Sequence, residues 1–328
     1  MGKNGLYPLK FKSIYKRTPW GGERLRSIFG KDIPSGEKIG ESWEIAALGN
    51  DNTLVANGTY KGVSLRQLLE ERRAEVLGDS VGYDGLKRFP LLIKFIDTAE
   101  RLSLQVHPDD SYASSHESPR EWGKTEAWYI IEAEPGAWVI RGAREGTTRE
   151  GFLEALESGR LEECLNFLPV CSGDALFIPP GTLHAVGAGI VLLEVQQNSD
   201  LTYRVYDWGR PRELHQRKAL EVIDFSPSED RVRPVLLSPQ PQKGELLVDC
   251  EKFIMELWDL SQPHEIRGLY TFDIITIIEG KAGIYYGEEG NLEVSPGESL
   301  LIPAKLQGYS ISPRERCKVV RASLPRAR

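Results

Sequence analysis

The sequence has few cysteines, no long apolar run and no cluster of positive charge, and each absence excludes a class of protein. Its four cysteines among 328 residues show no C-x-x-C spacing and are too few for a disulfide-stapled scaffold. We expect them to be buried packing residues in a reducing compartment. No apolar stretch approaches the length of a membrane span, and none near the N-terminus is typical of a signal peptide. The sequence therefore predicts a cytoplasmic protein without a membrane partner.

The net charge of the chain indicates which kinds of partner the protein can bind. A net charge of -7 without a long basic run argues against nucleic acid, because binding to a phosphate backbone needs a positive field. A small anionic substrate is compatible with this charge, since a few arginines that converge in one cleft bind phosphate whatever the overall balance. The composition, 40% hydrophobic and 27% charged, is that of a globular protein. The oligomeric state is left open between monomer and homodimer.

Short apolar segments rich in β-branched and aromatic residues recur through most of the chain. They predict a mainly β protein, either a sandwich or a barrel. Clear examples are residues 91–96, 127–131, 137–140, 175–178 and 190–195. We expect two helices on the exterior. One follows Ser64 as its N-cap and ends near Gly78, and the other opens at Thr147 or Thr148 and ends at Gly159.

A proline-rich stretch divides the chain. Residues 229–242 combine turn-forming composition with little apolar periodicity, so we interpret them as a linker between a domain of residues 1–228 and a smaller domain of residues 243–328. Apolar segments resume beyond the stretch, at 253–257, 270–278, 282–286, 299–302 and 319–320. They are numerous enough for a second, smaller barrel.

The strongest local pattern runs from Gly173 to His184. Its sequence, GDALFIPPGTLH, matches G-x5-P-x-G-x2-H, the second motif of the cupin β-barrels, at every fixed position. Gly173 opens a turn, the apolar run predicts a buried strand, and the Pro-Pro-Gly sequence predicts a tight turn. His184 would then begin the returning strand, with its imidazole directed into a jelly-roll-like barrel.

A metal at His184 needs further ligands, and the upstream candidates are Gln105, His107 and, after an insertion, Glu126. Residues i and i+2 of a strand share a face, so Gln105 and His107 can enter the same interior and meet His184. The first cupin motif usually has His-x-His here, and this chain has Gln at the first position. These four ligands would leave one negative charge around a divalent ion. That suits one Zn²⁺ per chain, or another first-row metal.

Three segments extend the pattern beyond the ligands. They are LSLQVHP at 102–108, GKTEAWY at 123–129 and PPGTLHA at 179–185. Together they resemble the type I mannose-6-phosphate isomerases (phosphomannose isomerases), particularly their short bacterial form, over most of residues 7–225. The resemblance implies zinc held by the four residues named above, with residues 1–228 as the catalytic domain. It also implies reversible conversion of mannose 6-phosphate to fructose 6-phosphate.

Several residues are candidates for the chemistry. Isomerisation through a cis-enediol needs a base and a cation near the developing enediolate. The sequence does not choose among the candidate bases, which are Glu194, Asp200, Lys124 and His107. The resemblance favours Asp200 and Arg204, because NSD-x3-R at 198–204 matches the family pattern. We expect Lys124 and Arg204 to stabilise the intermediate and to bind the substrate together with Ser103.

The C-terminal domain repeats only the start of the second motif. Gly297 and Pro303 keep the G-x5-P spacing, but Lys305 replaces the glycine and Gly308 replaces the histidine. We therefore expect a bicupin whose second barrel is degenerate, metal-free and structural. Two other functions stay open. One is another metal-dependent cupin enzyme, such as an iron oxygenase, for which two histidines and a carboxylate are suitable ligands, or a sugar-phosphate epimerase. The other is a non-catalytic sugar-binding bicupin.

Overall fold

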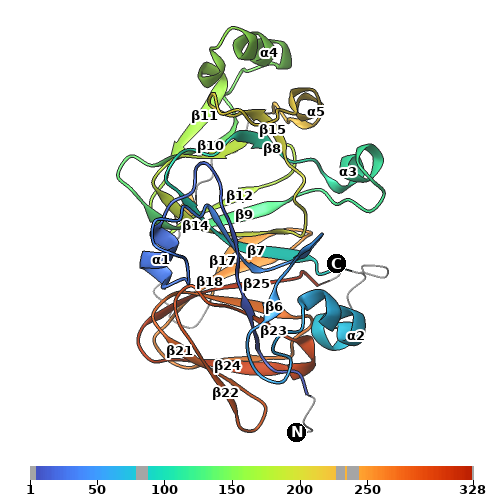
Figure 1. The fold of residues 1–328 in the computed structure, drawn as a ribbon, viewed down its shortest axis with the longest axis vertical. Coiled ribbons are helices and arrows are strands. Elements are labelled where there is room, and N and C mark those ends of the chain that lie inside the picture. The colour runs from blue at the N-terminus through green and yellow to red at the C-terminus, as the bar shows by residue number, and fades with distance from the viewer. Residues whose placement is uncertain (1–4, 79–87, 227–232, 235–243, 327–328) are drawn as a thin grey trace.

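In the computed structural model, the described residues are 5–78, 88–226, 233–234 and 244–326. They form the mainly β protein that the sequence predicts, and the larger sheets lie one above another along the long axis (Figure 1). In these ranges no helix has the length and apolar character needed to cross a bilayer. The strand pairs are antiparallel throughout.

Two facing sheets form the half of the molecule that contains the motif residues. The larger sheet has the strand order β16 (Arg233–Pro234), β12 (Asp174–Ile178), β9 (Glu126–Ala133), β14 (Ile190–Gln197), β7 (Leu91–Thr98), β3 (Glu41–Ile45), β2 (Ile14–Lys16). The smaller sheet has the order β11 (Leu165–Pro169), β10 (Trp138–Ala143), β13 (His184–Val186), β8 (Leu104–Val106), β15 (Tyr203–Tyr206). An apolar core fills the space between them.

Two further sheets form the other half. The larger has the order β17 (Glu245–Asp249), β18 (Ile254–Leu260), β25 (Cys317–Ser323), β20 (Asp273–Glu279), β23 (Ser299–Ile302), β1 (Leu9–Lys12), β6 (Leu54–Val55). The smaller has the order β19 (His264–Arg267), β24 (Gly308–Pro313), β21 (Ala282–Tyr286), β22 (Gly290–Val294). A separate hairpin consists of β4 (Ala47–Leu48) and β5 (Asp51–Asn52).

The helices are short and peripheral. They are α1 (Arg24–Phe29), α2 (Leu65–Leu77), α3 (Asp110–His116), α4 (Arg149–Glu157) and α5 (Gln216–Val222), with 3₁₀ turns at Leu161–Cys164 and Ala304–Leu306. The two predicted helices are confirmed as α2 and α4. The side chain of Ser64 caps the first and that of Thr148 caps the second, each accepting a backbone N–H. Helices α4 and α5 pack on the outer face of the β10–β8 sheet.

The two halves share one pairing order, which confirms the bicupin. Strand β14 lies between β7 and β9, and β12 pairs with β9; likewise β25 lies between β18 and β20, and β23 pairs with β20. In the smaller sheets, β13 lies between β10 and β8, as β24 lies between β21 and β19. The described ladders end at edge strands, so each barrel consists of two facing sheets rather than one continuous closed sheet.

A separate apolar core joins the two halves back to back. All eight residues of β7 and of β14 are buried, because both faces of these strands are covered. Val191, Leu193 and Val195 pack toward the second half, whereas Leu192 faces the interior of the first. Because of this alternation, Glu194 lies on the same face of β14 as Leu192. Glu194 belongs to the candidate site.

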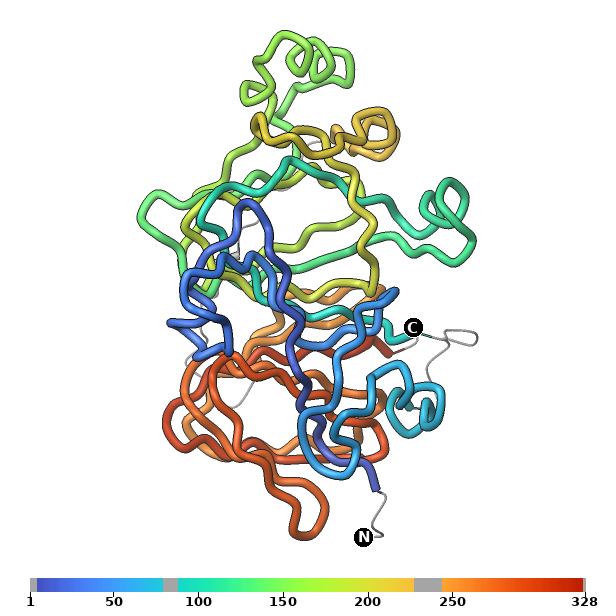
Figure 2. Tube along the Cα trace, viewed as in Figure 1, coloured from blue at the N-terminus to red at the C-terminus, as the bar shows by residue number. Residues whose placement is uncertain are grey.

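The N-terminal strands contribute to the C-terminal sheet. Leu9 on β1 pairs with Leu301 on β23, and the first part of the chain runs beside the C-terminal part in Figure 2. The predicted linker, 229–242, lies outside the described residues except for β16. The division of the chain into domains thus stays a prediction. The expectation that all cysteines are buried is wrong for Cys171, which is exposed, and only Cys317 of the four is fully buried.

The joining core supplies a stability prediction. Phe89 and Phe272 are both fully buried, and their ring centroids lie 4.8 Å apart. Replacing Phe272 by alanine would remove this contact and leave a cavity, so we expect a loss of about 3–5 kcal/mol in the free energy of unfolding, measured by urea titration. Leu246→Ala is the matched control, because Leu246 on β17 is 47% exposed. Equal midpoints for the two variants would contradict the prediction.

Candidate active site

The larger sheet of the first half contributes the acidic and basic side chains of the site. On β14, Glu194 lies opposite Lys94 on β7 and opposite Trp128 on β9. Glu126 is the first residue of β9 and lies opposite Gln196. Because side chains alternate along a strand, Lys94, Glu126 and Glu194 all point into the space between the two sheets.

The smaller sheet contributes the imidazoles. His184 begins β13, as the motif predicts, and it pairs with Gln105 on β8. His107 follows β8 directly, and the N–H of Gly181 donates to its carbonyl oxygen at 2.8 Å. Gly181 has φ 82°, and a Cβ there would lie 3.0 Å from the carbonyl oxygen of Val222, so the turn before His184 requires glycine.

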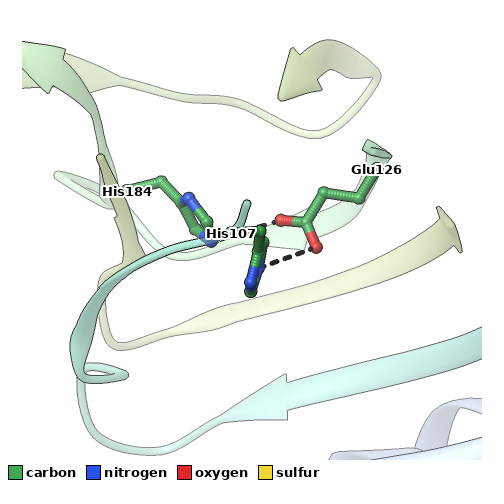
Figure 3. Close-up of side chains that lie close together, drawn as sticks. All are labelled: His107, Glu126 and His184. Atoms are coloured by element: carbon green, nitrogen blue, oxygen red, sulfur yellow. Dashed lines mark ion pairs between the residues drawn. The ribbon is translucent and has the colours of Figure 1, made fainter. Parts of the chain in front are cut away.

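Three potential metal ligands converge from these elements. The ligand atoms of His107, Glu126 and His184 all lie within 4.8 Å of one another, and all three residues are buried. One carboxylate oxygen of Glu126 lies 3.3 Å from Nε2 of His184 and the other 3.4 Å from Nε2 of His107 (Figure 3). The amide of Gln105 is 3.2 Å from Nε2 of His184. The structure thus brings the four predicted ligands together.

Hydrogen bonds at the far side of each ring determine which nitrogen faces the cluster. Nδ1 of His107 lies 2.9 Å from the carbonyl oxygen of Leu201, and Nδ1 of His184 lies 2.8 Å from that of Thr182. A carbonyl only accepts, so each Nδ1 carries the hydrogen and each Nε2 presents a lone pair. Burial lowers the pKa of both imidazoles and keeps them neutral. Two neutral imidazoles and a carboxylate with outer hydrogen bonds fit a divalent first-row metal.

Lys124 lies beside this cluster, as predicted from its position two residues before Glu126. Its Nζ is 2.6 Å from Glu126 and 3.2 Å from Glu194. Burial alone would lower the pKa of Lys124, but the two carboxylates outweigh it and raise this pKa. Burial would raise the pKa of Glu126, yet Lys124 is among the groups that lower it to about 2. Both groups are therefore charged at neutral pH.

Lys94 is a second buried lysine at the site, and it was not among the site residues predicted from the sequence. Its Nζ lies 3.3 Å from Glu194 and 3.3 Å from Glu41. Although burial lowers the pKa of Lys94, these carboxylates raise it well above its usual range. Burial, and next the charge of Glu126, raise the pKa of Glu194. The available signal was a single lysine inside the apolar segment 91–96, since a buried charge needs partners.

The remaining predicted residues line one cavity of about 270 Å³ together with both lysines and with two of the four predicted ligands, Gln105 and Glu126. Asp200, Ser103 and Arg204 all contribute to its wall. Nε of Arg204 donates to the hydroxyl of Ser103 at 3.3 Å. Arg212 lines the same cavity and was not assigned a role from the sequence; Asp207 accepts from its Nε at 2.6 Å. The wall of the cavity therefore contains two guanidinium groups in addition to the lysines and carboxylates.

Two family models match separate parts of the chain and leave residues 128–242, which include His184, unmatched. The protein-family model described as "Phosphomannose isomerase type I, catalytic domain" matches residues 8–127, which include Gln105, His107 and Glu126. The model "Mannose-6-phosphate isomerase, cupin domain" matches residues 243–323.

The relatives agree with these matches. The chain is 39% identical to mannose-6-phosphate isomerase ManA of Bacillus subtilis, over 92% of this chain and 96% of that protein. It is 38% identical to the mannose-6-phosphate isomerase of Streptococcus mutans, over 92% and 94%. The solved mannose 6-phosphate isomerase from Bacillus subtilis superposes with a TM-score of 0.88 at 36% identity, over 97% of this chain and 99% of that one. A putative mannosephosphate isomerase from Archaeoglobus fulgidus does so with a TM-score of 0.77 at 26% identity, over 97% of each.

Proposed function

The chain belongs to the type I mannose-6-phosphate isomerases, and we propose that it interconverts D-mannose 6-phosphate and D-fructose 6-phosphate through a cis-enediol at one Zn²⁺ site. It is thus an aldose–ketose isomerase whose substrate is a sugar phosphate. The observation that supports the proposed site most directly is the convergence of two neutral imidazoles and a carboxylate beside a cavity that two buried lysines line.

The metal would be held by Gln105 through its amide oxygen, by His107 and His184 through Nε2, and by Glu126. Bound there, Zn²⁺ would supply Lewis-acid polarisation of the C1 and C2 oxygens. The neutral amide and imidazoles leave a single negative charge among the ligands, so the ion keeps net positive charge toward the substrate. The neighbouring lysines add fixed positive charge where the enediolate would develop.

The environments of the candidate bases narrow the choice among them. Nε2 of His107 is committed to the metal, and Lys124 is protonated because its carboxylate neighbours raise its pKa. Glu194 and Asp200 remain. Burial raises the pKa of both carboxyls toward the range that an acid–base catalyst needs at neutral pH, but Glu194 is buried 3.2 Å from Lys124, whereas Asp200 is exposed. We therefore assign proton transfer between C1 and C2 to Glu194 and leave substrate positioning at the cavity mouth to Asp200.

Arg204 is assigned to the substrate phosphate. It lines the cavity, is only half-buried, and has no carboxylate partner within ion-pair distance among the described residues. We expect Arg204→Ala to raise KM for mannose 6-phosphate about 10- to 100-fold with a smaller change in kcat, as measured by steady-state kinetics. Arg160→Ala is the matched control, because Arg160 is exposed at the end of α4 and remote from the cavity. An unchanged KM would exclude Arg204 from phosphate binding.

A coupled assay with mannose 6-phosphate tests the activity itself. We expect turnover to fructose 6-phosphate by the zinc-loaded protein. Absence of turnover under these conditions would overturn the proposal. Metal analysis with a measurement of oxygen uptake separates the isomerase from an iron oxygenase built on the same histidines and carboxylate.

A further inference from the structure

The second half contains a cavity that the proposed reaction does not use. It has a volume of about 530 Å³, larger than the active-site cavity, and lies at the mouth of the C-terminal barrel between the ends of β18, β19, β20 and β25. Its lining includes three arginines, which are Arg267, Arg321 and Arg326. A cavity of this size accommodates a small metabolite.

Strand register identifies this cavity as the counterpart of the active site. Asp273 begins β20 as Glu126 begins β9, and it lies opposite Ser323 as Glu126 lies opposite Gln196. Arg321 lies two residues before Ser323 on β25, as Glu194 lies two residues before Gln196 on β14. Arg321 therefore corresponds to Glu194. Arg321 lies opposite Glu256.

The same register relates the cross-strand pairs and the ligands of the two halves. Glu256 takes the position of Lys94, so the ion pair across β14 and β7 recurs across β25 and β18 with its charges exchanged. Gly308 takes the position of His184, and its partner in the ladder, Arg267, takes the position of Gln105. The position of His184 has therefore become a glycine and that of Gln105 a guanidinium.

The floor of the cavity is an ion network in which one guanidinium lies between two carboxylates. Arg321 donates to Glu256 at 2.6 Å and to Asp273 at 2.7 Å, and the hydroxyl of Tyr309 donates to Asp273 at 2.9 Å. Nε of Arg321 is buried and has no hydrogen-bond partner in the described part of the chain. An unpaired buried donor is costly, so a ligand acceptor that reached this atom would be stabilised.

The rim of the cavity is positive. Arg326 is exposed and lies over the ring of Tyr270, with no ion pair to any described residue. Arg267 is also exposed, and its only described ion pair is with Glu265, where both side chains face solvent. Such pairs are weak and exchange readily for a stronger anion. Asp249 also lines the cavity and is suited to accept from hydroxyl groups.

We propose that this second cavity is a binding site for a phosphate monoester. The phosphate lies between Arg267 and Arg326 and accepts from Nε of Arg321, because guanidinium groups match the geometry and charge of a phosphate. No turnover occurs there, since the position of His184 is occupied by Gly308. The C-terminal half is then a second ligand site in addition to its packing role.

Isothermal titration calorimetry on the zinc-loaded full chain tests the proposal. The probe is sorbitol 6-phosphate, which lacks the carbonyl group that isomerisation requires and therefore binds without turnover. We expect two equivalents per wild-type chain and one equivalent for the double variant Arg267→Ala, Arg326→Ala, with the second site weakened at least about tenfold. The double variant should keep wild-type kcat and KM, since neither arginine belongs to the active site.

Arg314→Ala, Arg316→Ala is the matched control, because these arginines are exposed on the same half and outside the cavity. It should keep both equivalents. A single equivalent in the wild type that the cavity variant keeps, or two in the cavity variant, overturns the proposal. Inorganic phosphate and sorbitol are titrated into the wild-type protein in two further experiments. Phosphate binding as tightly as the ester identifies free phosphate as the ligand, tighter binding of the ester identifies a sugar phosphate, and equal binding of sorbitol overturns recognition of phosphate.

Discussion

Replacing His184 by alanine is expected to remove the bound metal and to lower kcat/KM for mannose 6-phosphate by at least about a thousandfold. The side chain is fully buried and its Nε2 faces the Glu126 carboxylate, so no neighbouring group can substitute for it. Loss of one ligand of four also weakens every metal-dependent step at once. Zinc content by elemental analysis and initial rates in the coupled assay measure the two effects.

His116→Ala is the matched control for this experiment. His116 is exposed on α3, where its ring stacks on Tyr112, and it has no contact with the metal cluster. This variant should retain one zinc per chain and wild-type kinetics. Full zinc content with wild-type activity in His184→Ala would contradict the proposed site.

The part of the site nearest the second motif could be predicted from the sequence because its determinants are local. The turn that precedes His184 depends on Gly181, whose backbone conformation and close contacts exclude a side chain. Strand alternation then relates Gln105 to His107 without knowledge of the fold. The caps of α2 and α4 are local in the same sense, since Ser64 and Thr148 each bond a backbone N–H three residues on.

Long-range pairing could not be predicted from the sequence. Strand β1 joins a sheet in which five strands, β17, β18, β20, β23 and β25, come from the opposite end of the chain, and nothing in its four residues specifies β23 as a partner. The apolar segment containing Lys94 likewise predicts a buried strand, but the lysine acquires its role only when Glu194 and Glu41 arrive from two other strands. Tertiary contacts, not local preference, decide both features.

The two barrels show which residues separate the proposed metal site from its degenerate counterpart. Both keep an ion pair between the strand that follows the second motif and its neighbour. Glu194 and Lys94 form it in the first barrel and are buried, whereas Arg321 and Glu256 form it in the second and are half-buried. The copy differs in sign at these positions and lacks the histidine. Where carboxylates attract a divalent cation in the first barrel, guanidinium groups favour an anion in the second.

Replacing Lys124 by methionine is expected to lower kcat by about 10²- to 10⁴-fold while one zinc per chain is retained. Methionine keeps the length of the side chain and removes the charge that we assign to stabilising the enediolate. The four ligands are unchanged, so loss of activity and loss of metal become separate observations. Zinc content and steady-state rates measure the two effects, with Lys305→Met as the control, since Lys305 is exposed in the C-terminal half.

The metal-free form of this variant supplies a second readout. Lys124 lies 2.6 Å from Glu126 and 3.2 Å from Glu194, and without its ammonium these buried carboxylates lose one of their cations. An uncompensated buried charge is strongly destabilising, and a divalent ion beside Glu126 would offset it. The rise in Tm on adding zinc should therefore be larger for Lys124→Met than for the wild type. Wild-type turnover, or loss of zinc together with turnover, would show that Lys124 is not the cation that acts on the intermediate.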